Sequence, residues 1–279
     1  MDFYKLSGSG NDFIIVDNTD GALGYKDWSK IAQKLCQRRI SIGADGLIVV
    51  MPSQTPKTDF KWLFYNADGS VADMCGNGGR CVALFACHKG IAGETMSFET
   101  GAGIIDAQIV ADDIVKIRLT EAHSYKESID IDVDGKMLSV SFVNTGVPHA
   151  VCFVDNLADY DVFNTGKAIR NHKNFAPAGT NVNFCSIIDG VVAVRTYERG
   201  VEDETLACGT GAVATALVSM RKGFVSSPVE VNVQSNEILK VYIEKDDQTN
   251  FEKIYLEGKV KIVYFGTTVD VGWQQNGCQ

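Results

Sequence analysis

The sequence predicts an α+β fold of mixed α/β type, built from two pseudo-symmetric domains that are each a strand-rich, barrel-like sheet around one central helix. The first observation is length, because 279 residues exceed one typical domain core. The second is pattern, since short strand-like segments outnumber helical ones throughout the chain. The third is repetition: a cysteine on a glycine-rich turn that runs into a helical pattern occurs at Cys75 and again 133 residues later at Cys208.

The first half begins with two strands within residues 1–17, joined by a turn at Ser7 to Gly10. An amphipathic helix is expected over residues 28–37, where apolar residues recur at helical spacing. The first cysteine motif then opens a second helix, which ends at Gly90 because glycine favours helix ends. Further strands are expected at 47–50, 60–65, 96–99, 104–110 and 114–119.

The second half repeats this plan. One helix is expected over residues 161–171, and another runs from the second cysteine motif to Gly223. Strands are expected at 129–133, 136–144, 149–154, 182–188, 191–197, 229–233, 238–244 and 253–263, followed by a last stretch through Val271. We expect an N-terminal domain of residues 1–119, joined by the C-terminal strand at about 266–279, and a C-terminal domain of residues 120–265.

Further matches between the halves follow the same order and indicate a duplication. Tyr65 before the first cysteine parallels Tyr197 before the second. Upstream, the segment 43–49 parallels 180–186, which sets Gly46 against Asn183. The segment 10–17 loosely parallels 146–155.

Composition excludes several classes of function. The net charge of −9 disfavours nucleic acid as a partner. No apolar run is long enough to span a membrane, and the N-terminus carries no secretion signal, so we expect a cytoplasmic protein. Eight cysteines are sparse at this length, which disfavours a disulfide scaffold. Five of them lie in apolar or helical patterns and are expected to be buried thiols: Cys36, Cys81, Cys87, Cys152 and Cys185.

Cys75 and Cys208 have a different context, because each lies where a helix begins. The positive end of the helix dipole lowers a thiol pKa from about 8.5 into the range of roughly 3.5 to 7.5. The neighbouring glycines let the backbone approach a ligand, and two helix N-termini aimed at one point form a carboxylate site. One thiolate could then remove the α-proton of an amino acid while the other thiol protonates the opposite face, without a cofactor. We expect this active site in the cleft between the domains.

At these same residues the chain resembles the diaminopimelate epimerase family. The resemblance runs over nearly the whole chain and is carried by Gly10-Asn11-Asp12-Phe13, Asn66 to Gly69, Met74 to Cys81, Val147-Pro148-His149, Asn183-Phe184, and Tyr197 to Gly200 with Ala207 to Gly211. It implies two similar domains with the site between them and interconversion of LL- and meso-2,6-diaminopimelate, in lysine and peptidoglycan precursor biosynthesis. It also implies no pyridoxal phosphate or metal, a small-molecule substrate and a homodimer. Charge and hydropathy, as above, predict no nucleic-acid or membrane partner.

Carried over by position, the resemblance implies that Cys75 and Cys208 are the acid/base pair. The reacting carboxylate would be held by Gly76, Asn77, Gly209 and Thr210. Other polar groups of the substrate would be held by Asn11, Asn66, Asn183 and Arg199, with Arg199 suited to the distal carboxylate by its bidentate fork. Glu198 would bind an ammonium group, and His149 and Glu198 would lie near the reacting centre.

Three alternatives stay open. Family members often have Asn where this chain has Val147, and Gly46 is another departure, so a related racemase with a different or broader substrate range is the nearest. Asn144 or Thr145 could replace the lost contact. A cysteine hydrolase or acyltransferase with His149 as base would leave one cysteine without a role. The third is a redox or ligand-binding module. Zinc is disfavoured because no Cys-x-x-Cys pair occurs.

Overall fold

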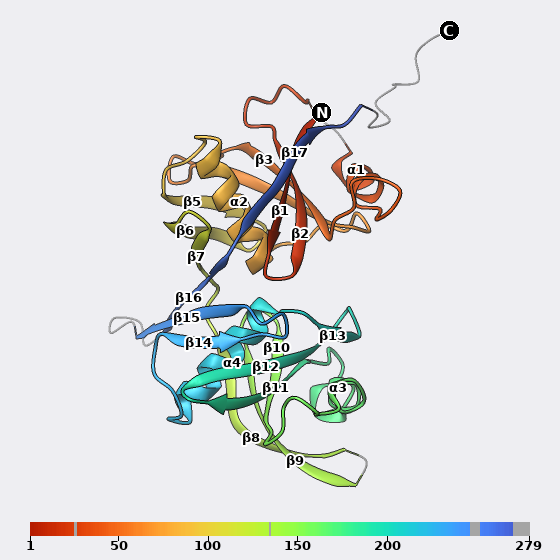
Figure 1. Ribbon diagram of the computed structural model, residues 1–279, viewed down its shortest axis with the longest axis vertical. Helices are drawn as coiled ribbons and strands as arrows, with labels where there is room; N and C mark the ends of the chain where they lie inside the picture. Colours follow the sequence, from red (N-terminus) through yellow and green to blue (C-terminus); the bar gives the residue numbers. More distant parts are fainter. Residues whose placement is uncertain (25–26, 134, 246–251, 270–279) are drawn as a thin grey trace. The chain divides into compact units, whose positions relative to one another are not determined.

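The computed structural model describes residues 1–24, 27–133, 135–245 and 252–269. It is a mixed α/β fold in which strands far outnumber helices, as the sequence predicts. The chain divides into two compact units, Met1–Ile117 with Lys259–Gln279 and Arg118–Gly258, called here the first and second unit (Figure 1). Within the described residues, each unit contains one set of paired strands and two α-helices.

The first unit wraps its strands against one helix. Its elements are β1 (Asp2–Gly8), β2 (Asn11–Asp17), α1 (Trp28–Leu35), β3 (Gly46–Pro52), β4 (Phe60–Asn66), α2 (Gly76–His88), β5 (Thr95–Thr100), β6 (Gly103–Ala111), β7 (Ile114–Arg118) and β17 (Lys261–Thr267). The strands pair in the order β17-β1-β2-β3-β4-β5-β6-β7, parallel at β2–β3 and β4–β5 and otherwise antiparallel. Helix α2 packs on β1, β2, β3 and β6, so it is the central helix of this unit.

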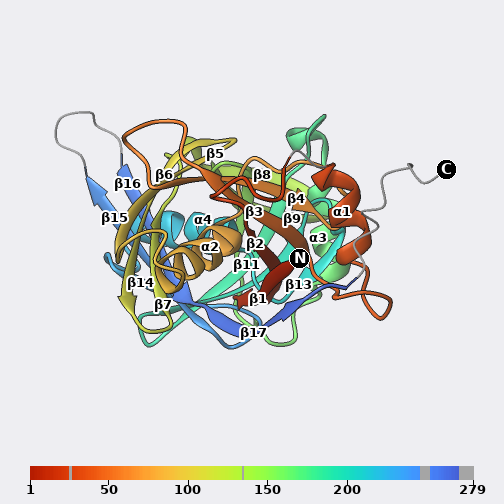
Figure 2. The same ribbon diagram turned by 90° about the horizontal axis from the view of Figure 1, so that it is seen from above.

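The second unit repeats this topology. Its elements are β8 (His123–Val133), β9 (Lys136–Asn144), β10 (Pro148–Phe153), α3 (Val162–Arg170), a 3₁₀ turn (Lys173–Phe175), β11 (Asn181–Ile188), β12 (Val191–Glu198), β13 (Asp203–Thr205), α4 (Gly209–Arg221), β14 (Val229–Asn232), β15 (Ile238–Lys245) and β16 (Glu252–Lys259). The pairing order is β8-β9-β10-β11-β12-β14-β15-β16, with parallel pairs at β10–β11 and β12–β14. Helix α4 packs on β9 to β12, β14 and β15, so it is the central helix of this unit. Figure 1 shows α4 next to β10, β12 and β14, and Figure 2 shows the same ribbon from above.

The strand register fixes which residues of the two units are equivalent. Phe13 pairs with Gly46 between β2 and β3, and His149 pairs with Asn181 between β10 and β11. Gly46 therefore corresponds to Asn181, not to Asn183 as the sequence match has it. The match is wrong by two residues because a two-residue shift preserves the alternation of a strand, so apolar pattern alone does not exclude it.

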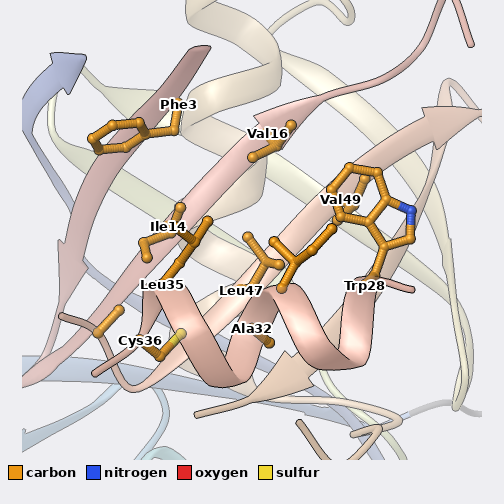
Figure 3. Packing of buried hydrophobic residues seen from close by; sticks show 11 residues of the cluster. Phe3, Ile14, Val16, Trp28, Ala32, Leu35, Cys36, Leu47 and Val49 are labelled. Carbon is orange, nitrogen blue, oxygen red and sulfur yellow. The ribbon is translucent and has the colours of Figure 1, made fainter. Parts of the chain in front are cut away.

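Helix α1 covers part of the sheet of the first unit. Asp27 caps it by accepting a hydrogen bond from the Lys30 amide at 3.2 Å. Its buried face packs on apolar side chains of the first three strands, as Figure 3 shows: Phe3, Ile14, Val16, Leu47 and Val49 against Trp28, Ala32 and Leu35. In the second unit Asp161 caps α3 in the same way, through the Asn164 amide at 3.1 Å. These helices hold the sheets that in turn position α2 and α4.

The chain returns to the first unit near its C-terminal end. The strand predicted over 253–263 is two strands, β16 and β17, because the chain passes from the second unit to the first at Gly258 and Lys259. All of β17 belongs to the first unit, where the sequence assigns to that domain only the segment from about 266. Residues 270–279, which include the predicted end at Val271 and Cys278, lie outside the described residues.

Candidate active site

Cys75 and Cys208 occupy the same place in the two units, directly before α2 and α4. Both are N-cap residues with extended backbone, at φ −145° and ψ 121° for Cys75 and φ −123° and ψ 109° for Cys208. The Cys75 sulfur accepts a hydrogen bond from the Gly78 amide at 3.4 Å. The Cys208 sulfur has no such bond from its helix and lies 3.5 Å from the Thr210 hydroxyl oxygen. Amides of the first turn of each helix have no acceptor within the helix, so each N-terminus favours an anion.

In the first unit a chain of amides supports the start of α2. The Asn77 side chain donates to the Asn11 side-chain oxygen at 2.8 Å, and Asn11 donates to the Asp45 carboxylate at 3.0 Å. Arg80, which is fully buried, donates to the Asn77 oxygen at 2.8 Å and to the Ser9 hydroxyl at 2.6 Å. The structure therefore brings Asn11 and Asn77 together beside Cys75. The buried Asn77 side chain is held by protein groups, so its backbone amide is the group suited to bind an anion.

Next to these amide side chains lies a cluster of charged residues formed by Asp12, Asp45, Lys5 and Arg38. Asp12 accepts from Lys5 at 2.8 Å and from Arg38 at 2.5 and 3.1 Å, and Arg38 also donates to Asp45 at 2.8 Å. Lys5 donates as well to the Gly43 carbonyl. Burial alone would raise the pKa of Asp12, but the hydrogen bonds and charges of Arg38 and Lys5 outweigh it and lower that pKa. The cluster anchors Asn11 through Asp45.

In the second unit His149 lies at the centre of the polar groups. It is completely buried, and its Nε2 lies 3.0 Å from the Thr210 hydroxyl oxygen. Burial lowers the pKa of His149 to about 3, and the charge of Arg199 acts in the same direction, so the ring is neutral at physiological pH. On its other side Nδ1 lies 3.0 Å from the Asn183 amide nitrogen. Thr145 donates to the Thr210 carbonyl at 3.0 Å and so fixes the start of α4.

Glu198 ends β12 beside Cys208. Burial raises the pKa of Glu198, and hydrogen bonds from the Thr205 hydroxyl and the Cys208 thiol partly offset this. The Thr205 bond measures 2.9 Å. Glu198 is therefore a hydrogen-bond acceptor for the Cys208 thiol, whereas the sequence predicts that it binds an ammonium group and lies near the reacting centre. Arg199 follows it, with its backbone amide on the Asn181 side chain at 2.9 Å and its guanidinium on the Ala178 carbonyl at 3.2 Å.

Two predicted ligand contacts lie in contrasting surroundings. Asn66 is exposed at the end of β4, and its amide donates to the Ser70 hydroxyl at 3.0 Å. Asn183 is fully buried behind His149, with its amide bonded to His149, to the Ala150 carbonyl at 3.1 Å and to the Thr196 hydroxyl at 2.9 Å. All of its polar atoms are thus engaged by protein groups, which suits a supporting position better than a direct contact with a ligand.

The remaining cysteines differ from Cys75 and Cys208 in environment. Burial is the main cause that raises the pKa of Cys36 and of Cys152 to about 12. Cys81 and Cys185 are also buried, and Cys87 is half-buried. These five are the thiols expected from the sequence to be structural. Within the described part of the chain, no group of three or more His, Cys, Asp or Glu residues is placed to hold a metal ion.

Several residues that build the site were not singled out from the sequence. Thr196 and Asn181 orient Asn183 and Arg199, while Arg80 and Ser9 lock the loop before β2 onto α2. A usable signal exists for Thr196: the sequence match of Tyr65 with Tyr197 sets this polar residue at the position that Phe64 holds in the first unit, and the strand register agrees. No helix within the described ranges has the length and apolarity to cross a membrane.

Comparison with known proteins matches both the fold and the duplication. The family model described as diaminopimelate epimerase matches residues 3–124 and 141–263, one segment in each half. The solved structure of a probable proline racemase from Agrobacterium radiobacter K84 superposes with a TM-score of 0.73 at 13% identity, covering 98% of this chain and 94% of that one. A PhzF-family phenazine biosynthesis protein from Bacillus anthracis gives 0.72 at 18% identity, covering 95% and 98%. These two structures establish likeness of fold.

Sequence relatives are much closer. The diaminopimelate epimerase of Hydrogenobaculum sp. is 46% identical, with 94% of this chain and 96% of that protein covered. The diaminopimelate epimerase of Aquifex aeolicus is 45% identical, with 95% and 97% covered. With equivalent cysteines capping α2 and α4 and relatives of this similarity over nearly the full length, the chain belongs to the diaminopimelate epimerase family.

Proposed function

We propose that this protein interconverts LL- and meso-2,6-diaminopimelate without a cofactor, with Cys75 and Cys208 as the acid/base pair. The observation that carries the proposal is that both cysteines cap equivalent helices, in a chain that is 45–46% identical to diaminopimelate epimerases. A thiol at such a position is suited to proton transfer because the helix dipole and free amides favour the thiolate.

The reaction needs one thiolate and one thiol. The thiolate takes the α-proton, the electron pair of the C–H bond passes to the α-carbon and its carboxylate, and the other thiol then protonates the opposite face. Each turnover exchanges the protonation states of the two cysteines, so the reverse reaction uses the same groups. We call each cysteine with its immediate neighbours a half-site, the first around Cys75 and the second around Cys208. In the second half-site Glu198 accepts a hydrogen bond from the Cys208 thiol, and the Thr210 hydroxyl oxygen lies within hydrogen-bond distance of the Cys208 sulfur.

The substrate groups are assigned to residues that still have free donors or charge. The backbone amides of Gly76, Asn77, Gly209 and Thr210 bind the reacting carboxylate. Arg199 binds the distal carboxylate, while Asn11, Asn66 and Glu198 bind the remaining polar groups. Asn183 is left out of this set because all its polar atoms have protein partners.

Proton NMR in deuterated water tests the reaction directly. With the reduced enzyme, LL-diaminopimelate should lose its α-proton signal and the meso isomer should appear, with no added cofactor. Cys75→Ala and Cys208→Ala should each abolish the conversion. Turnover that depends on added pyridoxal phosphate, or full activity in either variant, would contradict the proposal.

A related racemase with another substrate remains the second candidate, for a specific reason. Val147 lacks the amide that family members often have, and the two side chains that could replace it already make hydrogen bonds within the protein. Thr145 donates to the Thr210 carbonyl, and Asn144 accepts from the Gly146 amide at 3.0 Å. A panel of amino acids in the same exchange assay separates the two candidates, because only the preferred substrate exchanges at low concentration.

We further propose a cytoplasmic homodimer that acts in lysine biosynthesis. Strand β17 supports self-association, since Val263 and Phe265 lie on one face of it, both are exposed, and Phe265 is 76% accessible. Sedimentation should show a dimer whose dissociation is promoted by Phe265→Glu. A wild-type monomer at micromolar concentration would exclude this assembly.

A further inference from the structure

A continuous series of hydrogen-bonding groups leads from the interior of the second unit to the Cys208 sulfur. The Thr196 hydroxyl donates to the Asn183 oxygen at 2.9 Å, and the Asn183 nitrogen lies 3.0 Å from His149 Nδ1. His149 Nε2 lies 3.0 Å from the Thr210 hydroxyl oxygen, which lies 3.5 Å from Cys208 Sγ. Thr196, Asn183 and His149 are all buried, so water does not compete for the bonds among these three, and Thr210, which is half-buried, links them to the sulfur.

The direction of the series follows from the amide of Asn183. Its oxygen accepts from Thr196, and its nitrogen donates to the Ala150 carbonyl at 3.1 Å, which fixes which end of the amide faces the histidine. An amide nitrogen only donates, so His149 Nδ1 must accept and carries no proton. In a neutral imidazole the proton is then on Nε2, and Nε2 donates to the Thr210 hydroxyl oxygen.

We propose that Asn183 is a positioning residue that fixes His149 as the Nε2–H tautomer and thereby directs the Thr210 hydroxyl proton to the Cys208 sulfur. This inference rests on the proposed two-thiol function, which it deepens by assigning a residue that prepares Cys208 as a thiolate. Thr210 contributes its hydroxyl to the sulfur in addition to its backbone amide.

The opposite tautomer would reverse the effect. An unprotonated Nε2 would accept the Thr210 proton, and the thiolate would lose that donor. Hydrogen bonds to ionised groups are about twice as strong as neutral ones, so the loss would fall mainly on the thiolate form of Cys208. On its other side Cys208 donates its thiol proton to Glu198 when it is protonated, so the two neighbours serve the two protonation states.

A role in packing alone does not explain these residues. The equivalent positions in the first unit hold Phe13, Ile48 and Phe64, and the Phe13 and Phe64 rings pack edge to face with centroids 5.9 Å apart. The same arrangement of strands and helix therefore forms with three apolar residues at these positions. A purely structural Asn183 would be replaceable by the isoleucine that the first unit uses.

Nitrogen NMR of the full chain with ¹⁵N-labelled histidine tests the tautomer without substrate. The chain has four histidines, and His149→Gln assigns the signals of His149 by their disappearance. We expect the shift of an unprotonated nitrogen at Nδ1 and of a protonated one at Nε2. A proton on Nδ1 in the wild type would overturn the proposal, whatever the activity of the enzyme.

Two variants then test the consequence for Cys208. Asn183→Asp replaces the donor with an acceptor of the same size, so the proton of His149 should move to Nδ1. Asn183→Ile copies Ile48 and removes the bond, and it serves also if the aspartate variant does not fold. In each, kcat should fall by about 10- to 100-fold with KM changed less than about 3-fold, as expected for the loss of one hydrogen bond to a charged group.

Alkylation by iodoacetamide, read by peptide mass mapping, locates the effect in one half-site. Cys208 should react about 10-fold more slowly at pH 7 in both variants, whereas Cys75 in the other unit should react as in the wild type. Asn156→Asp, the same change at an exposed position of the second unit, should alter neither cysteine. Unchanged Cys208 reactivity in folded Asn183→Ile would overturn the inference. Because neither readout needs a substrate, this failure is distinct from a failure to epimerise diaminopimelate.

Discussion

The two half-sites share the same strand register and the same helix that begins at the cysteine. They differ in the side chains of the strands on which that helix packs. Asn183 occupies the position of Ile48, because Ile48 pairs with Ile15 and with Phe64 as Asn183 pairs with Val151 and Thr196. Three apolar residues of the first unit thus correspond to three hydrogen-bonded polar residues of the second. A satisfied buried polar set need not cost stability, so one copy of a duplicated fold can acquire such a network while the other retains an apolar core.

The immediate neighbours of the sulfurs show the same division. Cys75 accepts from a backbone amide, whereas Cys208 is flanked by a hydroxyl and a carboxyl group. Backbone donors cannot change their protonation, but Glu198 can take up a proton. We infer that the second half-site adjusts its hydrogen bonds as Cys208 changes protonation state.

The largest expected effect is the loss of turnover when either cysteine is removed, which tests whether both cysteines are needed for the reaction. Cys75→Ala and Cys208→Ala should each lower kcat by more than about 10³-fold, since each removes one of the two proton carriers of the proposed mechanism. Cys87→Ala, at a half-buried cysteine late in α2, is the matched control and should keep activity. The measurement is α-proton exchange, with circular dichroism to confirm folding. Retention of turnover by only one of the two variants would show that the halves are not equivalent in the chemistry.

A pair of glycine variants tests whether the different side chains that pack under α2 and α4 affect activity. Gly78 and Gly211 are equivalent, each three residues after its cysteine. A Cβ at Gly78 would meet Ile48, Cys75 and Phe13 at 3.4 to 3.6 Å, which is ordinary contact, whereas a Cβ at Gly211 would clash with the Asn183 oxygen.

Gly211→Ala should therefore lower kcat by about 10- to 100-fold, because it displaces Asn183 from His149. Gly78→Ala should keep kcat and raise the free energy of unfolding by about 0.5 to 1 kcal/mol, as alanine favours a helix. Steady-state kinetics and denaturant unfolding measure both. Equal effects of the two variants would show that the buried polar set does not distinguish the half-sites.

The difference between the two half-sites also shows which features of the site could be predicted from the sequence. Cys75 and Cys208 are identifiable because the glycine turn, the following apolar spacing and the repetition are all local patterns. The hydrogen bonds of Asn183 to His149 and Thr196 were not predictable, since they depend on strand register, and a two-residue shift leaves the apolar pattern intact. The break between β16 and β17 was missed for a related reason: both strands are apolar and alternate, and only tertiary pairing shows that β17 joins β1.

Titration should reveal His149, which has Phe13 as its equivalent and so has no counterpart in the first unit. Its folded pKa of about 3 is below the usual value of 6.5, so the unfolded chain binds the extra proton as the pH falls. The contribution is fully present above pH 6.5 and is lost on acidification between 6.5 and 3. From pH 7 to pH 5 this amounts to about 2 kcal/mol of unfolding free energy.

His149→Gln should reduce that slope by one proton, measured by urea unfolding at several pH values. His123→Gln, at an exposed histidine of β8, is the control and should leave the slope as it is. If the slopes of the wild type and His149→Gln coincide, the histidine is not buried in its neutral form, and the proton assignment of the second half-site fails with it.

The smallest effect concerns the ion cluster of the first unit, which reaches Asn11 through Asp45. Arg38 bonds Asp12 and Asp45, but its side chain is 57% exposed, so solvent screens these charges. Arg38→Gln should lower the free energy of unfolding by only about 0.5 to 1 kcal/mol and raise KM by less than about 3-fold, with kcat unchanged. Kinetics at low and high salt measure this. A large fall in kcat would mean that Asn11 needs the cluster to hold Asn77 beside Cys75, and that the first half-site also depends on a charged network, which would remove the contrast between the two.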